Sequence, residues 1–143
     1  MSVRLSHLGI CVRDLTASLR FWCDGLGFTV AEGYDLTDAM IPGLAEALEV
    51  PSPISMRSQM IKRDDLKIEV ISYTEPLVTG TPSVSRGALG FTHLSFLTPD
   101  IDSFAQHLLS CGGTLLPDTR RNVGIEVVFL ADPDGTRVEL MQG

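Results

Sequence analysis

The sequence has no long hydrophobic run and no paired set of cysteines. It contains no stretch of about eighteen apolar residues, and its first residues lack the basic-then-apolar order of a secretion signal. We therefore expect a cytoplasmic protein that does not engage a membrane. Cys11, Cys23 and Cys111 are odd in number and show no C-x-x-C spacing, which argues against a disulfide framework and against a thiolate zinc site.

Basic residues are also scarce. The chain has 11 Lys and Arg against 18 Asp and Glu, for a formal charge of −7, and its only adjacent basic pairs are Lys62-Arg63 and Arg120-Arg121. A nucleic-acid binder needs a clustered basic excess, so this class is excluded. P-loop, G-x-G-x-x-G, nucleophile-elbow and H-E-x-x-H motifs are absent as well, which leaves nucleotide hydrolysis, hydride transfer, serine esterase chemistry and zincin proteolysis without support.

What the sequence does contain is an internal repeat. Segments 7–15 and 93–101 each begin with His-Leu and reach an Asp followed by Leu or Ile seven residues later. Apolar residues then recur at helical spacing in both copies. Segments 64–69 and 134–139 match in the same way, since each is a turn followed by a strand with one acid between apolar neighbours. Two copies of one unit are therefore predicted.

Each copy is expected to run strand, helix, strand, strand, strand. The predicted strands are 3–12, 28–33, 55–61 and 67–73 in the first copy, and 91–97, 113–116, 125–131 and 136–141 in the second. Because one such unit cannot close a core alone, we expect a single α+β domain over 1–143, with module one at 1–74, a connector at 75–88 and module two at 89–143. The first copy carries an insertion within 34–56, which the sequence predicts to hold a short amphipathic helix.

Four polar residues occupy equivalent places in the two copies: His7, Glu69, His93 and Glu139. Side chains alternate between the faces of a strand, and both glutamates lie between apolar residues, so the carboxylates should point away from the helices. The histidines share that face by the same alternation. A polar residue on an open sheet face is often merely solvated, but the matched recurrence favours one shared site. Imidazole and carboxylate ligands suit one divalent ion, namely Zn, Ni, Co, Mn or Fe(II).

At this point the sequence resembles a known family. The stretches 7–10, 14–15, 18–22 and 26–28 are similar to the opening of the vicinal oxygen chelate superfamily, and 132–140 resembles its closing strand. Members include glyoxalase I, methylmalonyl-CoA epimerase, extradiol dioxygenases, thiol transferases acting on fosfomycin, and metal-free bleomycin-binding proteins. The resemblance implies two βαβββ modules forming a curved mixed sheet around a central metal-site cleft. By position, it implies that the metal ligands are His7, Glu69, His93 and Glu139.

The number of ligands indicates the chemistry. Four protein ligands leave two adjacent open positions, which suit a small carbonyl substrate that loses a proton to form an enolate or enediolate stabilised by the metal. A carboxylate that loosens from the ion is well placed as the base. We expect Glu139 in this role, with Glu69 as the second candidate; glyoxalase I is similar in its use of ligand glutamates. The sequence thus predicts a metal-dependent isomerase or lyase of the glyoxalase or epimerase type.

Other polar residues are candidates for substrate contact. Arg57 and Gln59 share a face of the third predicted strand, and Arg120 and Arg121 precede Gly124 in a predicted loop, although simple solvent exposure explains each of them too. The insertion within 34–56 is expected either to cover the site or to pack on the domain.

Two alternatives stay open. One is an extradiol-type dioxygenase that uses only His7, His93 and Glu139 on its iron; the other is a metal-free protein that binds a small molecule, as resistance proteins do. We also expect a homodimer, with a site that lies within one chain or between two.

Overall fold

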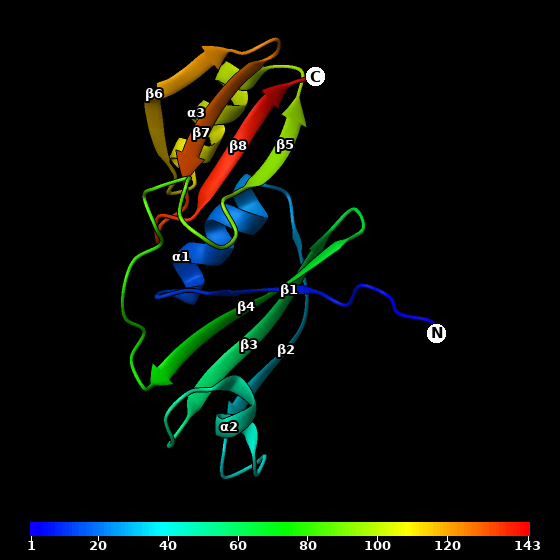
Figure 1. Cartoon of the computed structure of the whole chain (residues 1–143), viewed down its shortest axis with the longest axis vertical. Coiled ribbons are helices and arrows are strands. Elements are labelled where there is room, and N and C mark those ends of the chain that lie inside the picture. The colour runs from blue at the N-terminus through cyan, green and yellow to red at the C-terminus, as the bar shows by residue number, and fades with distance from the viewer. The chain divides into compact units, whose positions relative to one another are not determined.

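The computed structural model describes residues 1–143, which form eight strands in two four-stranded sheets (Figure 1). The first part of the chain contains β1 (Leu8–Cys11), α1 (Leu15–Leu19), the π-helical turn η1 (Arg20–Gly25), β2 (Thr29–Thr37), α2 (Leu44–Leu48), β3 (Ser55–Arg63) and β4 (Leu66–Glu75). The second contains β5 (Leu94–Thr98), α3 (Ile101–Ser110), β6 (Thr114–Asn122), β7 (Glu126–Ala131) and β8 (Arg137–Gln142). No helix has the length and apolar character needed to cross a bilayer.

Both sheets have the same topology. The strand order is β1-β4-β3-β2 in one and β5-β8-β7-β6 in the other. In each sheet the first strand runs parallel to the last, and the remaining pairs are antiparallel. This repetition confirms the predicted α+β class and the two βαβββ modules.

The chain divides into two compact units, which are described separately. Unit 1 comprises Met1–Thr16 and Gly27–Thr79, and unit 2 comprises Ala17–Leu26 and Gly80–Gly143. Most of the first helical segment therefore groups with the second sheet, although the sequence places it in module one. The reason lies in its apolar face: Phe21 and Trp22 are fully buried, and the Trp22 indole N–H donates to a carboxylate oxygen of Asp132 at 3.1 Å.

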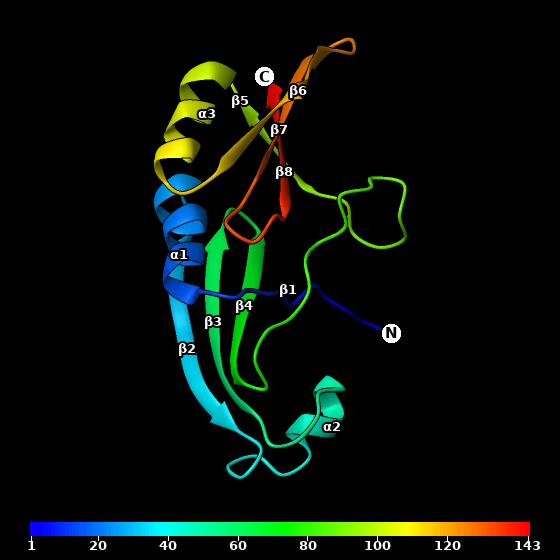
Figure 2. The same cartoon turned by 90° about the vertical axis from the view of Figure 1, so that its left-hand side faces the viewer.

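In unit 2, α3 lies against one side of the sheet (Figure 2). Its first turn is capped by Asp100, whose carboxylate accepts a hydrogen bond from the Ser103 backbone N–H at 3.0 Å. Ile101 and Leu108 on the helix are buried, as predicted from the helical spacing of the apolar residues. These contacts place the helix layer on the side opposite to Glu139, because the neighbouring side chains of β8 are the ones that are fully buried.

Unit 1 shows how the insertion packs. Helix α2 begins just after Pro42, and its Ala45 joins a core cluster with Ile54 and Met56. Ile71 and Tyr73 pack against this cluster, and both share the sheet face of Glu69 because they lie two and four residues along β4. The insertion therefore covers part of the face that carries Glu69, towards the end of the sheet (Figure 2).

Two predicted boundaries are wrong. The first strand was expected over 3–12, but it spans only Leu8–Cys11, the four residues that pair with Ile68–Ile71 of β4. The strand expected at 113–116 continues as β6 to Asn122, past a bulge between Leu116 and Arg121. The bulge lets the strand continue to pair with β7 beyond Pro117 and Asp118.

Candidate metal centre

His7 and Glu69 form a close pair in unit 1. His7 lies directly before β1, and Glu69 lies in β4 opposite Gly9. The imidazole Nε2 is 3.2 Å from a carboxylate oxygen of Glu69. The other ring nitrogen, Nδ1, is 2.9 Å from the Ser6 hydroxyl, which fixes the ring orientation.

His93 and Glu139 repeat this arrangement in unit 2. Nε2 of His93 is 3.4 Å from a Glu139 oxygen, and its Nδ1 is 2.8 Å from the Thr92 hydroxyl. Two contacts have no counterpart in unit 1: the Ser95 hydroxyl donates to the Glu139 carboxylate at 2.7 Å, and the His93 ring meets Phe129 edge to face at 5.0 Å between centroids. Glu139 is therefore more firmly oriented than Glu69, which faces Gly9.

The strand register explains both pairs. In each unit the glutamate aligns with the residue two positions after the histidine, Gly9 or Ser95. Residues two apart share a face of a strand, so parallel pairing brings imidazole and carboxylate together. The hydroxyl residue before each histidine was not singled out by the sequence analysis, although the repeated Ser-His and Thr-His dipeptides are a visible signal.

The donor atoms of each pair fit a divalent ion. Two nitrogen or oxygen ligands bound at about 2.1 Å lie roughly 3.0–3.4 Å apart in octahedral or tetrahedral geometry, and the observed separations are 3.2 and 3.4 Å. Without an ion, the same distances allow the imidazole N–H to donate to the carboxylate. In neither unit does a third His, Cys, Asp or Glu complete a group that could hold a metal. Each pair thus supplies half of the predicted ligand set.

Arg57 and Gln59 lie on the other face of the first sheet. Gln59 aligns with Val70 and Arg57 with Ser72, whereas Glu69 aligns with Met60. The Gln59 amide donates to the carbonyls of Ala31 and Glu32 at 3.0 and 3.2 Å, where β2 is bulged. Arg57 donates to Gln59 at 3.1 Å and pairs with Asp35 at 3.3 Å. These contacts stabilise the bulge, and the two side chains are not part of the face that carries His7 and Glu69.

Arg120 and Arg121 lie in β6 and not in a loop, which corrects the prediction. Arg120 contacts Asp102 of α3 at 2.7 Å and Glu126 at 3.1 Å, and hydrogen bonding by these carboxylates raises the pKa of the guanidinium. It therefore ties the helix to the sheet. Arg121 aligns with Val127, two residues from Phe129, and so lies exposed on the face of Glu139. Of the two arginines, only Arg121 lies on the sheet face that carries Glu139.

Tyr73 lies on the sheet face that carries Glu69 and was not predicted from the sequence as a site residue. It lies four residues after Glu69 on the same face and packs against the insertion. Burial, together with electrostatic interactions with Cys11 and Glu69, raises the pKa of its phenol. Its neighbours in the insertion are distant in sequence, so no local pattern identifies it.

The chain is similar to known proteins over nearly its whole length. Residues 4–140 match the family described as the Glyoxalase/Bleomycin resistance protein/Dioxygenase superfamily. The uncharacterized protein YaeR of Escherichia coli (strain K12) is 28% identical, over 97% of this chain and 95% of that protein.

Two solved structures show the same fold. A glyoxalase family protein from Bacillus cereus superposes with a TM-score of 0.80 at 17% identity, covering 99% of this chain and 95% of the other. The fosfomycin resistance protein FosX from Listeria monocytogenes, solved with Mn(II) and sulfate, superposes with a TM-score of 0.61 at 17% identity, covering 100% of this chain and 94% of the other.

Proposed function

Because the chain belongs to the Glyoxalase/Bleomycin resistance protein/Dioxygenase superfamily, we propose that it is a metal-dependent isomerase or lyase of the glyoxalase type, acting on a small carbonyl substrate. The superfamily contains both enzymes and binding proteins that catalyse nothing, so membership alone does not decide the function. The observation that carries the proposal is the pair of matched His–Glu contacts, at 3.2 and 3.4 Å, each with its histidine held by a neighbouring hydroxyl.

One divalent ion would be held by His7, Glu69, His93 and Glu139. The four ligands come from one chain or from two copies in a homodimer, which we include in the proposal. Zn, Ni, Co, Mn and Fe(II) all suit these ligands, and the Mn(II) in the FosX structure supports a metal of this group. When bound, such an ion supplies a Lewis acid that stabilises negative charge on a carbonyl oxygen.

The side chains then have distinct roles. Glu139 removes the proton from the carbon next to the carbonyl and returns it to that carbon or its neighbour. Ser95 orients the Glu139 carboxylate through its 2.7 Å hydrogen bond, and Thr92 orients His93. Glu69 lies opposite Gly9, which has no side chain that could orient the carboxylate as Ser95 orients Glu139. Glu69 serves as a ligand and as the second candidate base.

The three-ligand dioxygenase remains the weaker candidate. It requires Glu69 to lie near the iron without binding it, whereas Glu69 approaches His7 as closely as Glu139 approaches His93. Small-molecule binding without a metal does not require two matched His–Glu pairs, so this alternative leaves their recurrence unexplained.

Exchange of substrate protons with solvent deuterium tests the proposal. The purified protein, reconstituted separately with Zn, Ni, Co, Mn and Fe(II), is incubated in D2O with thiohemiacetals, acyl-CoA esters and hydroxyketones, and exchange is followed by NMR. We expect exchange α to the carbonyl with at least one metal and none after chelation. Oxygen consumption with catechols in the absence of such exchange would favour the dioxygenase instead.

A further inference from the structure

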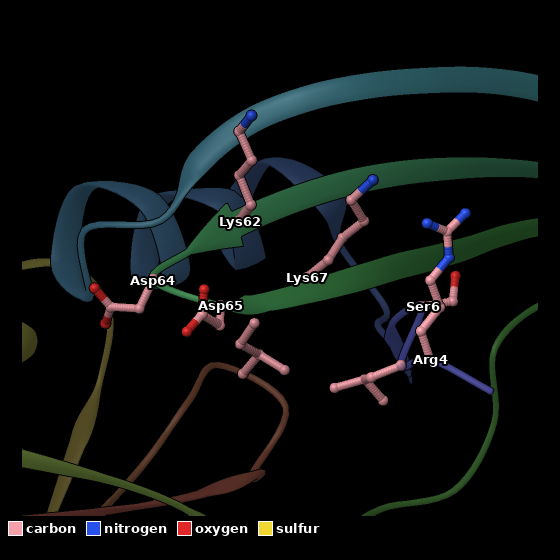
Figure 3. A pocket seen from close by; sticks show the side chains of 8 residues that line it. Arg4, Ser6, Lys62, Asp64, Asp65 and Lys67 are labelled. Carbon is pink, nitrogen blue, oxygen red and sulfur yellow. The ribbon is translucent and has the colours of Figure 1, made fainter. Parts of the chain in front are cut away.

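Unit 1 contains a pocket of about 590 Å³, shown in Figure 3. It is lined by Arg4, Leu5, Ser6, Lys62, Asp64, Asp65, Leu66 and Lys67. Ser6 is the residue whose hydroxyl holds His7, and Lys67 precedes Glu69 by two residues and so shares its sheet face. The pocket is therefore continuous with the face that carries half of the proposed ligand set.

The charge distribution in this pocket is unusual for the chain. The whole protein carries a formal charge of −7 and contains only two lysines. Both line this pocket, and they are directly opposed in the register of β3 and β4. Figure 3 shows their ammonium groups and the guanidinium of Arg4 on the same side of the hairpin.

Like charges directly opposed across two strands destabilise a sheet. The nearby carboxylates offset this only in part. Glu32 pairs with Lys67 at 3.1 Å, and Asp64 pairs with Arg63 at 3.5 Å. Asp65 also lines the pocket, and Glu32 attracts Lys62 as well as Lys67. Neither Arg4 nor Lys62 lies within ion-pair distance of a carboxylate, however, so both cationic groups can still turn to an incoming anion.

The second module provides an internal comparison. Its closing hairpin has Ala131 opposite Arg137, at the places where the first module has Lys62 opposite Lys67. The opposed cations are thus not a requirement of the βαβββ fold. They are particular to one half of the molecule.

We propose that this pocket binds an oxyanion, a phosphate or a carboxylate, carried by the substrate whose carbonyl end reaches the His7–Glu69 pair. This inference rests on the proposed function and narrows it to carbonyl substrates with an anionic end. Lys62 and Arg4 bind the anion, and Lys67 contributes as it exchanges its contact with Glu32 for one with the ligand.

Because the chain has only two lysines, a lysine-specific probe reports on this pocket directly. Reductive methylation with 13C-labelled formaldehyde, which keeps the positive charge, yields two lysine signals that are followed by NMR during titration with inorganic phosphate, sodium acetate or sodium chloride at constant ionic strength. We expect both signals to shift saturably with phosphate, acetate or both, and not with chloride. The salt whose titration gives saturable shifts identifies the class of anion that the pocket binds. Equal shifts with all three salts would overturn the proposal.

Variants make the test specific. Calorimetric titration of the unmodified protein with the anion that saturates should show that Lys62→Gln and Lys67→Gln each weaken binding by about three- to fivefold, as expected for exposed charges. Arg137→Gln, at the position equivalent to Lys67 in the second module, should leave the affinity unchanged. Equal loss in Arg137→Gln and Lys62→Gln would contradict the assignment.

A matched substrate pair links the pocket to the reaction. Dihydroxyacetone phosphate and dihydroxyacetone differ only in the phosphate, and both can exchange protons α to the carbonyl. If phosphate saturates the pocket, Lys62→Gln should raise KM for the phosphorylated ketone alone. If acetate saturates it, the matched pair is pyruvate and acetone, and the variant should raise KM for pyruvate alone. Equal effects on both members would overturn the substrate assignment. Absence of exchange with every substrate would refute the proposed function, while the anion titration still decides whether the pocket binds.

Discussion

Glu139→Gln should lower metal-dependent solvent exchange by about 10²–10⁴-fold, the range typical for the loss of a positioned general base. Glutamine keeps the size of the side chain and still accepts the hydrogen bond from Ser95, but it cannot take up a proton. The metal also loses a charged ligand, so exchange is measured at saturating metal and the bound metal is determined in the same samples. The rate loss is then assigned to the base and not to an empty site.

The matched control is Asp118→Asn, which removes an exposed carboxylate from β6 of the same unit. Exchange by this variant should match the unmodified protein. Glu69→Gln is informative as well, because a larger rate loss in this variant than in Glu139→Gln would identify Glu69 as the base. Full exchange activity in Glu139→Gln would refute its role as the base.

Asp132→Ala should lower the free energy of unfolding by about 2–4 kcal/mol, because the buried Trp22 indole N–H and two part-buried backbone N–H groups lose their acceptor. Asp132 is only 3% exposed. One carboxylate oxygen accepts from Trp22 at 3.1 Å, and the other accepts from the backbone N–H groups of Asp134 and Thr136 at 2.9 and 2.8 Å. Burial raises the pKa of this carboxyl group, while the hydrogen bonds act in the opposite direction. The side chain thus fixes the turn before β8 and anchors η1.

Urea denaturation of the apo protein measures this effect without interference from metal. Trp22→Phe removes one of the three donors and should cost about 1 kcal/mol in addition to the cost of the cavity that the smaller ring leaves in the core. Asp118→Ala serves as the exposed control and should change stability by less than about 0.5 kcal/mol. If Asp132→Ala were as stable as this control, the turn and η1 would not depend on the carboxylate.

The sequence was sufficient for the fold, and for assigning each histidine and glutamate to one sheet face, because the signals repeat. Each glutamate lies between apolar neighbours, so strand alternation alone assigns its face, and the second copy provides an independent test of the first. Parallel pairing of β1 with β4 and of β5 with β8 then brings His7 to Glu69 and His93 to Glu139, as the structure shows.

The sequence was insufficient where a side chain's place depends on register or on distant contacts. The face of Gln59 depends on how β3 aligns with β4, and a slip of one residue reverses every side chain. Its partners, Ala31 and Glu32, lie in a bulge of β2 that no local pattern identifies. Arg120 was assigned to a loop before Gly124, but β6 continues past a bulge to Asn122 and places Arg120 next to Asp102 of α3.

The central claim is that both His–Glu pairs bind a common ion. Metal titration with calorimetry and elemental analysis tests it most directly, on the unmodified protein and on His7→Ala and His93→Ala. The account predicts one ion per chain, and loss of tight binding in either variant alone. Two ions per chain with one lost in each variant, or binding unaffected by either substitution, would contradict it.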